Sequence, residues 1–182
     1  MVAGSTQSAE FVEPPLAPFE ALPGDWHVLH TRSRQEKAVA EELDARNIAH
    51  FLPSIRQKRV YGGRKAVVDE PMFPGYVFLK GTLDDAYEAD RTRRVARIIP
   101  VVDQTQLATE LKSLWLALED QVTLDPFPYL RCGMCVEVRS GPLRGVQGLI
   151  ETRLGVSRLI LQVQMLGRAV ALEVDGALLE PA

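Results

Sequence analysis

Cysteine is scarce in this sequence. Only two cysteines occur among 182 residues, Cys132 and Cys135, and both lie in one short segment. Two residues so close together cannot hold a fold by a disulfide framework, so we expect packed apolar cores and a reducing, cytoplasmic environment. Tetrahedral zinc needs about four ligands, and the three histidines (His27, His30 and His50) are far away in the sequence. No metal and no cofactor is therefore expected.

Long apolar runs are missing as well. No stretch approaches the roughly 18 consecutive apolar residues that a membrane-spanning helix needs, so no membrane association is expected. Residues 1–25 have no Lys or Arg and no apolar run, and we expect no signal peptide there. Residues 1–24 mix Ser, Gln, Glu, Ala and Pro without periodicity, which predicts a disordered leader.

A catalytic constellation is absent too. His27 and His30 are three positions apart on an expected strand, so they point to opposite faces and cannot share a metal. Acid pairs such as Glu41-Glu42 have no neighbouring base in the sequence. No Ser–His–Asp set, phosphate-binding glycine loop or HExxH motif occurs. We therefore expect that the chain is not an enzyme.

Net charge is small, −3, but it is unevenly distributed. Residues 31–97 hold 14 Lys and Arg against 10 Asp and Glu. Residues 1–25 hold four acids and no Lys or Arg, and residues 98–182 hold 7 basic against 10 acidic residues. A nucleic-acid contact is therefore expected in the middle region rather than in the flanking ones.

Residues 25–120 have the pattern of a helix-covered antiparallel sheet of the α+β class. Strands are expected over 26–31, 48–52, 76–80 and 96–102, and an exposed hairpin over 54–70. Helices are expected after Ser33, Thr82 and Asp103, the first two with capping-box spacing to Glu36 and Asp85. In the third helix, leucines recur at positions 107, 111, 114 and 118, which predicts a helix buried on one side.

The last part of the chain predicts a different architecture. Residues 121–130 contain two prolines and are interpreted as a short linker. Over residues 131–182, short segments of alternating apolar residues are separated by glycine-containing turns. That pattern predicts a small five-stranded β-barrel.

Two sequence motifs extend this interpretation. The first comprises Trp26-His-Val-Leu-His30 and, later, Pro71-Met-Phe-Pro-Gly-Tyr-Val-Phe-Leu79. The second is the run Gly133-Met-Cys-Val-Glu-Val-Arg-Ser-Gly-Pro-Leu-Arg-Gly-Val-Gln-Gly148, with Gly167-Arg168 before the last strand. They resemble the amino-terminal NGN domain and the KOW motif of the NusG family of transcription elongation and antitermination factors. The long leader, short linker and basic hairpin resemble specialised members such as RfaH, which implies an operon-specific role.

The resemblance implies that RNA polymerase is a partner, bound at its clamp helices by an apolar patch. The matching positions here are Phe73 and Tyr76, which flank Pro74-Gly75. Aromatic side chains beside a rigid Pro-Gly corner provide a large preordered apolar contact, as interface hot spots do. Alternatively, Phe73 and Tyr76 are core residues of a strand, since aromatic side chains are frequent in cores.

The expected hairpin is a candidate nucleic-acid contact. It holds five positive charges and no acid between residues 56 and 65, and Tyr61 near its tip could stack on an unpaired base. We expect a contact with upstream or non-template DNA through Arg56, Lys58, Arg59, Tyr61, Arg64 and Lys65. The alternative is a solvated loop. Another basic group, at positions 91, 93, 94 and 97, is interpreted as the favourable C-terminus of a helix.

The carboxy-terminal barrel has candidate contacts of its own. Leu143 and Arg144 lie at the tip of an expected loop. The resemblance implies a ribosomal small-subunit protein or the Rho terminator as the partner there. KOW domains also occur in ribosomal proteins, so a ribosome- or RNA-binding module is the alternative function, although the acidic balance of residues 98–182 argues against it. The chain is expected to be a monomer.

Overall fold

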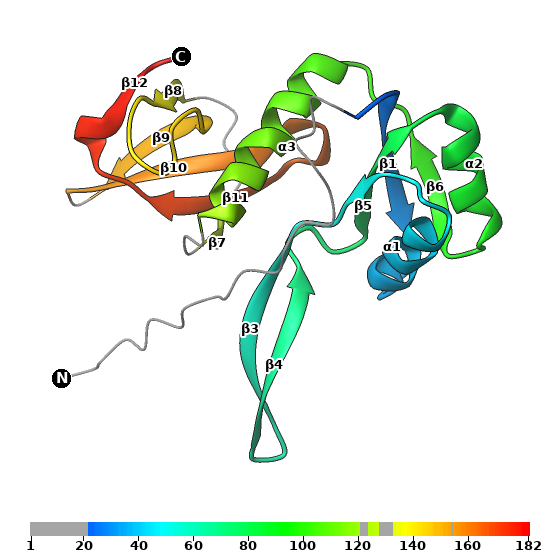
Figure 1. Cartoon of the computed structure of the whole chain (residues 1–182). Helices are drawn as coiled ribbons and strands as arrows, with labels where there is room; N and C mark the ends of the chain where they lie inside the picture. The colour runs from blue at the N-terminus through cyan, green and yellow to red at the C-terminus, as the bar shows by residue number, and fades with distance from the viewer. Residues whose placement is uncertain (1–21, 121–123, 128–132, 154) are drawn as a thin grey trace.

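The computed structural model describes residues 22–120, 124–127, 133–153 and 155–182. Almost all of the predicted leader, much of the predicted linker and Cys132 lie outside these residues. The chain forms twelve strands and three α-helices in the described part (Figure 1). In order they are β1 (Asp25–Thr31), α1 (Glu36–Ala45), β2 (His50–Phe51), β3 (Ser54–Tyr61), β4 (Arg64–Pro71), β5 (Tyr76–Gly81), α2 (Leu83–Arg91), β6 (Val95–Ile99), α3 (Gln104–Glu119), β7 (Asp125–Phe127), β8 (Met134–Val138), β9 (Gln147–Arg153), β10 (Val156–Val163), β11 (Arg168–Glu173) and β12 (Leu179–Pro181).

The amino-terminal sheet is antiparallel, with the strand order β2-β5-β1-β6. Its central strand β1 buries side chains on both faces, as the apolar sequence at 26–31 predicts. On one face, Trp26 and Val28 pack with Phe78 and the leucines of α3. On the other face, Leu29 packs with apolar side chains of α1, α2 and β6. The sheet is therefore covered by α3 on one side and by α1 and α2 on the other.

Helix starts follow the sequence in two of three cases. Thr82 and Asp85 form the predicted capping box of α2, and Asp103 accepts a hydrogen bond from the Gln106 backbone at the start of α3. The capping box predicted at Ser33 and Glu36 is wrong, because α1 begins at Glu36 itself and has no side-chain cap. The Glu36 carboxylate instead accepts a hydrogen bond from the Gly75 backbone N–H, in the loop between β4 and β5.

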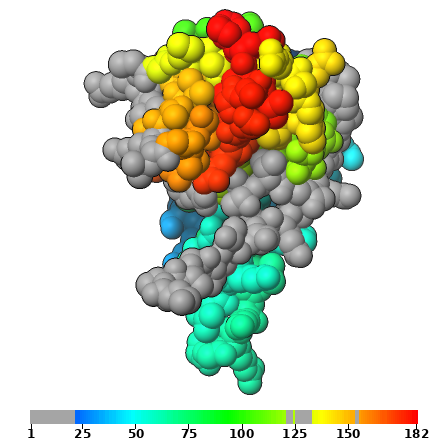
Figure 2. Space-filling view, turned by 90° about the vertical axis from the view of Figure 1, so that its left-hand side faces the viewer, coloured from blue at the N-terminus to red at the C-terminus, as the bar shows by residue number. Residues whose placement is uncertain are grey.

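A two-stranded hairpin, β3 and β4, extends away from both sheets (Figures 1 and 2). Tyr61 pairs with Arg64, so the turn consists of Gly62 and Gly63 alone. Both glycines have positive φ, 54° and 80°, as the tight hairpin turn requires. Residues 54–70 were predicted as an exposed hairpin, and the structure has it there.

The carboxy-terminal sheet comprises strands β7 to β12 in the order β12-β8-β9-β10-β11-β7. It has six strands where five were predicted, because Asp125–Phe127, within the predicted linker, pairs antiparallel with β11. Alternate side chains of β8, β10 and β11 fill its interior, including Val138, Leu159 and Leu172. The fold is thus α+β throughout, with antiparallel sheets, as the sequence predicts.

Helix α3 lies between the two sheets and contacts both (Figure 1). Its predicted leucine stripe is buried: Leu107, Leu111 and Leu114 are at most 2% exposed. A second stripe, made of Gln106, Glu110, Ser113 and Ala117, faces the carboxy-terminal sheet, and Ala117 and Ser113 are buried there.

Three residues of the second stripe make polar contacts with the carboxy-terminal sheet. The Gln147 backbone N–H donates to Ser113 Oγ at 3.1 Å, and the Gln164 N–H donates to the Glu110 carboxylate. The Gln106 side chain contacts that of Gln164. We call this contact the seam.

Truncation of Leu114 should destabilise the protein substantially. Its side chain is fully buried on α3, and Leu→Ala in a core costs about 2–5 kcal/mol of unfolding free energy. Glu119→Ala, at the exposed end of the same helix, is the matched control and should change stability by no more than about 0.5 kcal/mol. Chemical denaturation of both variants would measure this, and equal stabilities would contradict the central position of α3.

Candidate interaction surfaces

The corner between β4 and β5, residues 73–76, is held by hydrogen bonds from two other elements. The Thr31 N–H donates to the Gly75 carbonyl at 2.8 Å, and the Gly75 N–H donates to Glu36 Oε1 at 2.6 Å. Glu36 is only 7% exposed, so its carboxylate is a buried anchor for this backbone. Gly75 has a φ of 90°, which disfavours any residue with a Cβ. The corner is therefore preordered.

The two aromatic side chains of the corner have different surroundings. Phe73 is 2% exposed and packs edge-on against Phe78, with 6.4 Å between ring centroids. Phe73 is therefore a core residue, which was the alternative to its being a contact with a partner protein. Tyr76 is half-buried and stacks on His30 at 5.2 Å, while Pro74 is exposed. The accessible part of the predicted patch thus consists of Pro74 and Tyr76, and His30 joins it.

A row of side chains continues from Tyr76 across the sheet. His30 lies opposite Tyr76 on β5 and opposite Arg97 on β6. Directly opposed residues of antiparallel strands point to the same face, so these three side chains share the face that α3 covers further along. The sequence did not indicate His30 as a site residue, because its role depends on strand register, which no local motif encodes.

The basic hairpin is less cationic than its sequence predicts. Arg59 makes a two-pronged ion pair with Glu70 at 2.9 and 2.7 Å, and Arg56 pairs with Asp69 at 3.2 Å. The Arg59 guanidinium holds the pKa of the Glu70 carboxyl below its usual range. These acids lie on β4, just outside the acid-free segment counted in the sequence.

Positive charge remains at the outer part of the hairpin. Lys58, Arg64 and Lys65 have no ion-pair partner among the residues that the structure describes. Tyr61 and Val60 at the same end are 61% and 66% exposed. Of the six predicted contact residues, the structure therefore leaves Tyr61, Arg64 and Lys65 exposed at the tip and Lys58 exposed further along β3, and it engages Arg56 and Arg59 in ion pairs within the hairpin.

A second basic surface includes arginines that the sequence pattern assigned to a helix C-terminus. The Arg32 backbone N–H donates to the Arg94 carbonyl at 2.8 Å, so the turn after β1 lies beside the turn after α2. We call the resulting group the arginine surface, and its members are Arg32, Arg34, Arg93, Arg94 and Arg97. All except Arg94 are exposed.

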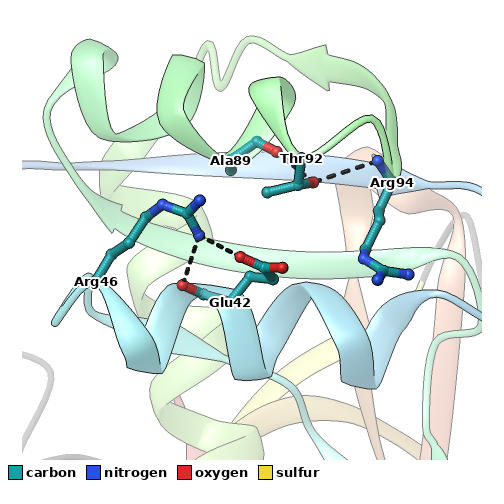
Figure 3. A network of polar contacts seen from close by, with 5 residues as sticks. All are labelled: Glu42, Arg46, Ala89, Thr92 and Arg94. Carbon is teal, nitrogen blue, oxygen red and sulfur yellow. Dashed lines mark hydrogen bonds and ion pairs between the residues drawn. The ribbon is translucent and has the colours of Figure 1, made fainter.

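The helix-terminus interpretation of positions 91–97 holds only for Arg91. Helix α2 ends at Arg91, which pairs with Glu88. Thr92 closes the helix, because its hydroxyl donates to the Ala89 carbonyl at 2.7 Å and accepts from the Arg94 N–H at 3.2 Å (Figure 3). Across from it, Arg46, directly after α1, pairs with Glu42 of that helix and lowers the pKa of the Glu42 carboxyl. After Thr92 the chain turns, and Arg93 and Arg94 lie beside the turn that contains Arg32 and Arg34.

The expected contacts on the carboxy-terminal sheet are only partly accessible. Leu143 is half-buried and packs against the core, whereas Arg144 is exposed. Arg144 also lines a cleft of about 710 Å³ between this sheet and α3, together with Lys80, Lys112 and Glu137. Within the described residues, no group of His, Cys, Asp and Glu could hold a metal ion, and no helix has the length and hydropathy to cross a membrane.

Residues 24–114, half of the chain, match the family model described as "Transcription termination factor nusG". The chain is 23% identical over 171 residues to the transcription termination/antitermination protein NusG of Rickettsia prowazekii, covering 82% of this chain and 86% of that protein. Two solved structures, "Domain interaction in Thermotoga maritima NusG" and "Crystal Structure of MjSpt4:Spt5 complex conformation A", are each 16% identical and cover 86% of this chain and 96% and 97% of theirs, with TM-scores of 0.43 and 0.27. By the family-model match, this chain belongs to the NusG family.

Proposed function

We propose that this protein is a transcription elongation and antitermination factor that binds RNA polymerase through the corner at residues 73–76. The observation that carries the proposal is the preordered corner, where Tyr76 and His30 are stacked beside an exposed Pro74. A rigid apolar contact loses little conformational entropy on binding, which favours a protein partner. The clamp helices of the polymerase are the proposed contact, as the resemblance of the sequence motif at residues 71–79 implies.

The nucleic-acid contact is assigned to two surfaces of the amino-terminal unit. The outer half of the hairpin offers Lys58, Arg64 and Lys65 with the exposed ring of Tyr61, a combination suited to phosphate contact and base stacking. The arginine surface lies next to the row Tyr76–His30–Arg97, at the corner end of the sheet. A factor bound to polymerase by the corner would thus present two basic surfaces to upstream or non-template DNA.

The domain boundaries and the contact on the carboxy-terminal domain are proposed from the sequence and from its resemblance to the NusG family. We assign residues 25–120 to the polymerase-binding domain and residues 131–182 to a KOW domain, with Arg144 as a contact for a further protein partner. The basic hairpin supports action on a restricted set of operons. A ribosome- or RNA-binding module is the alternative, and recovery of ribosomes without polymerase in a pull-down would favour it.

Replacement of Tyr76 should weaken binding to core RNA polymerase. Loss of a central aromatic side chain from an interface typically costs about 2 kcal/mol or more, a decrease of roughly 30-fold in affinity. Tyr87→Ala is the matched control, because Tyr87 is 50% exposed on α2, which covers the other face of the sheet. Phe73 is left intact, since its burial means that truncation would destabilise the fold.

Binding to core polymerase would be measured with all three proteins after thermal unfolding has shown that they are equally folded. Equal affinities for Tyr76→Ala and wild type would move the polymerase site away from the corner. No binding by the wild type would contradict the proposed function itself.

Charge reversal at Arg64 or Arg93 should weaken DNA binding in a salt-dependent manner. Each lost phosphate contact lowers the slope of log affinity against log salt by about 1. Arg168→Glu, an exposed reversal on β11 of the carboxy-terminal sheet, changes net charge equally and should leave the slope unchanged. Salt titrations on a nucleic-acid scaffold with polymerase would measure this, and identical slopes for Arg64→Glu and Arg168→Glu would exclude the hairpin tip.

A further inference from the structure

The seam contains a carboxyl group in an unusual position. Glu110 lies on the second stripe of α3, and the Gln164 backbone N–H reaches both of its oxygens at 3.2 Å. The Gln106 side chain donates to Glu110 Oε1 at 3.1 Å. Gln164 belongs to the turn that follows β10. The Glu110 carboxyl of α3 is therefore hydrogen-bonded to the backbone of the carboxy-terminal unit.

Among the residues that the structure describes, no cation compensates the charge of this carboxyl group. Glu110 has no ion pair among the described residues, and two grooves flank it. The other ionisable groups that line these grooves are Asp103, from the start of α3, and the thiol of Cys135, from β8. The turn after β10 contributes only uncharged side chains, Gln164 and Met165. An ionised Glu110 is therefore poorly stabilised when the seam is closed.

A hydrogen-bond acceptor without a donor lies in the same groove. Gln162 Oε1, on β10, is buried and has no hydrogen-bond partner in the described residues, and it lines the groove that Glu110 lines. A protonated carboxyl has an O–H to donate, whereas a carboxylate is an acceptor only. Protonation of Glu110 would thus remove a half-buried charge and supply an O–H donor in the groove where Gln162 Oε1 has no partner.

The pKa of Glu110 agrees with this geometry. Burial raises it from an ordinary 4.5 to about 6, and Asp103 adds to the increase, although the hydrogen bonds from Gln164 and Gln106 act in the opposite direction. Burial comes in part from the carboxy-terminal sheet, so opening of the seam should return the pKa towards its ordinary value.

We propose that Glu110 makes the contact between α3 and the carboxy-terminal sheet dependent on proton uptake, so that acidification tightens the seam and ionisation loosens it. The sign follows from linkage: the closed state has the higher pKa, so it binds the proton more tightly. The stabilisation is complete below pH 4.5 and is lost as pH rises through about 6. Between pH 7.5 and pH 5 the closing equilibrium should strengthen about eightfold.

The pKa of Glu110 is the direct test. Carbon-13 NMR of the side-chain carboxyl in the full chain should give a value near 6. A value at or below 4.5 would overturn the proposal. This measurement needs no substitution, so it stands even if a variant at this position is poorly folded.

Closure itself can be followed at the Gln147 amide, which donates to Ser113 Oγ across the seam and is not bonded to Glu110. Its hydrogen-exchange protection factor, corrected for the intrinsic pH dependence of exchange, should rise about eightfold from pH 7.5 to pH 5 in the wild type. Glu110→Gln cannot ionise, so its protection factor should be independent of pH.

Glu119→Gln removes a carboxyl from the exposed end of the same helix and should behave as the wild type does. A flat profile in the wild type would overturn the proposal. So would a Glu110→Gln profile as steep as that of the wild type, because a group other than Glu110 would then account for the pH dependence.

Discussion

Burial of α3 between two sheets is the constraint on which the rest of the structure depends. Its leucine stripe, including Leu107, Leu111 and Leu114, completes the core of the amino-terminal sheet. Its second stripe contacts the carboxy-terminal sheet through hydrogen bonds. One helix of sixteen residues thus packs against both sheets. Its displacement would expose apolar side chains of the amino-terminal and the carboxy-terminal units. The corner at residues 73–76 is held separately, by hydrogen bonds to the Thr31 backbone and to the Glu36 carboxylate at the start of α1.

Much of this architecture could be predicted from the sequence because it follows from apolar periodicity. The period of α3, the two-sided burial of β1 and the Gly-Gly hairpin turn are local patterns, and each has one dominant structural solution. The second stripe of α3 could not be predicted in this way. Gln106, Glu110 and Ser113 have the composition of a solvated helix face, and only the docked sheet shows that they contact a second unit.

The candidate site was predictable to the extent that it depends on local motifs. The Pro-Gly corner was located correctly as a structural feature, but which aromatic ring faces outward depends on strand register. The same limit applies to charge. Arg56 and Arg59 are neutralised by acids that lie 13 and 11 residues away along the chain but on the neighbouring strand of the hairpin, Asp69 directly opposite Arg56 and Glu70 diagonal to Arg59. The arginine surface joins turns about sixty residues apart, through one backbone hydrogen bond between Arg32 and Arg94.

The hairpin has a mechanical consequence that its charge does not convey. Strand β4 runs directly into the corner at Phe73, and each strand of the ladder has eight residues, about 26 Å at a rise of roughly 3.3 Å per residue. The distance between the tip and the corner is therefore fixed by strand length rather than by a flexible tether. The length of the hairpin strands therefore sets how far from the corner the tip can contact a second surface. Natural variants with longer or shorter strands would reach a different distance.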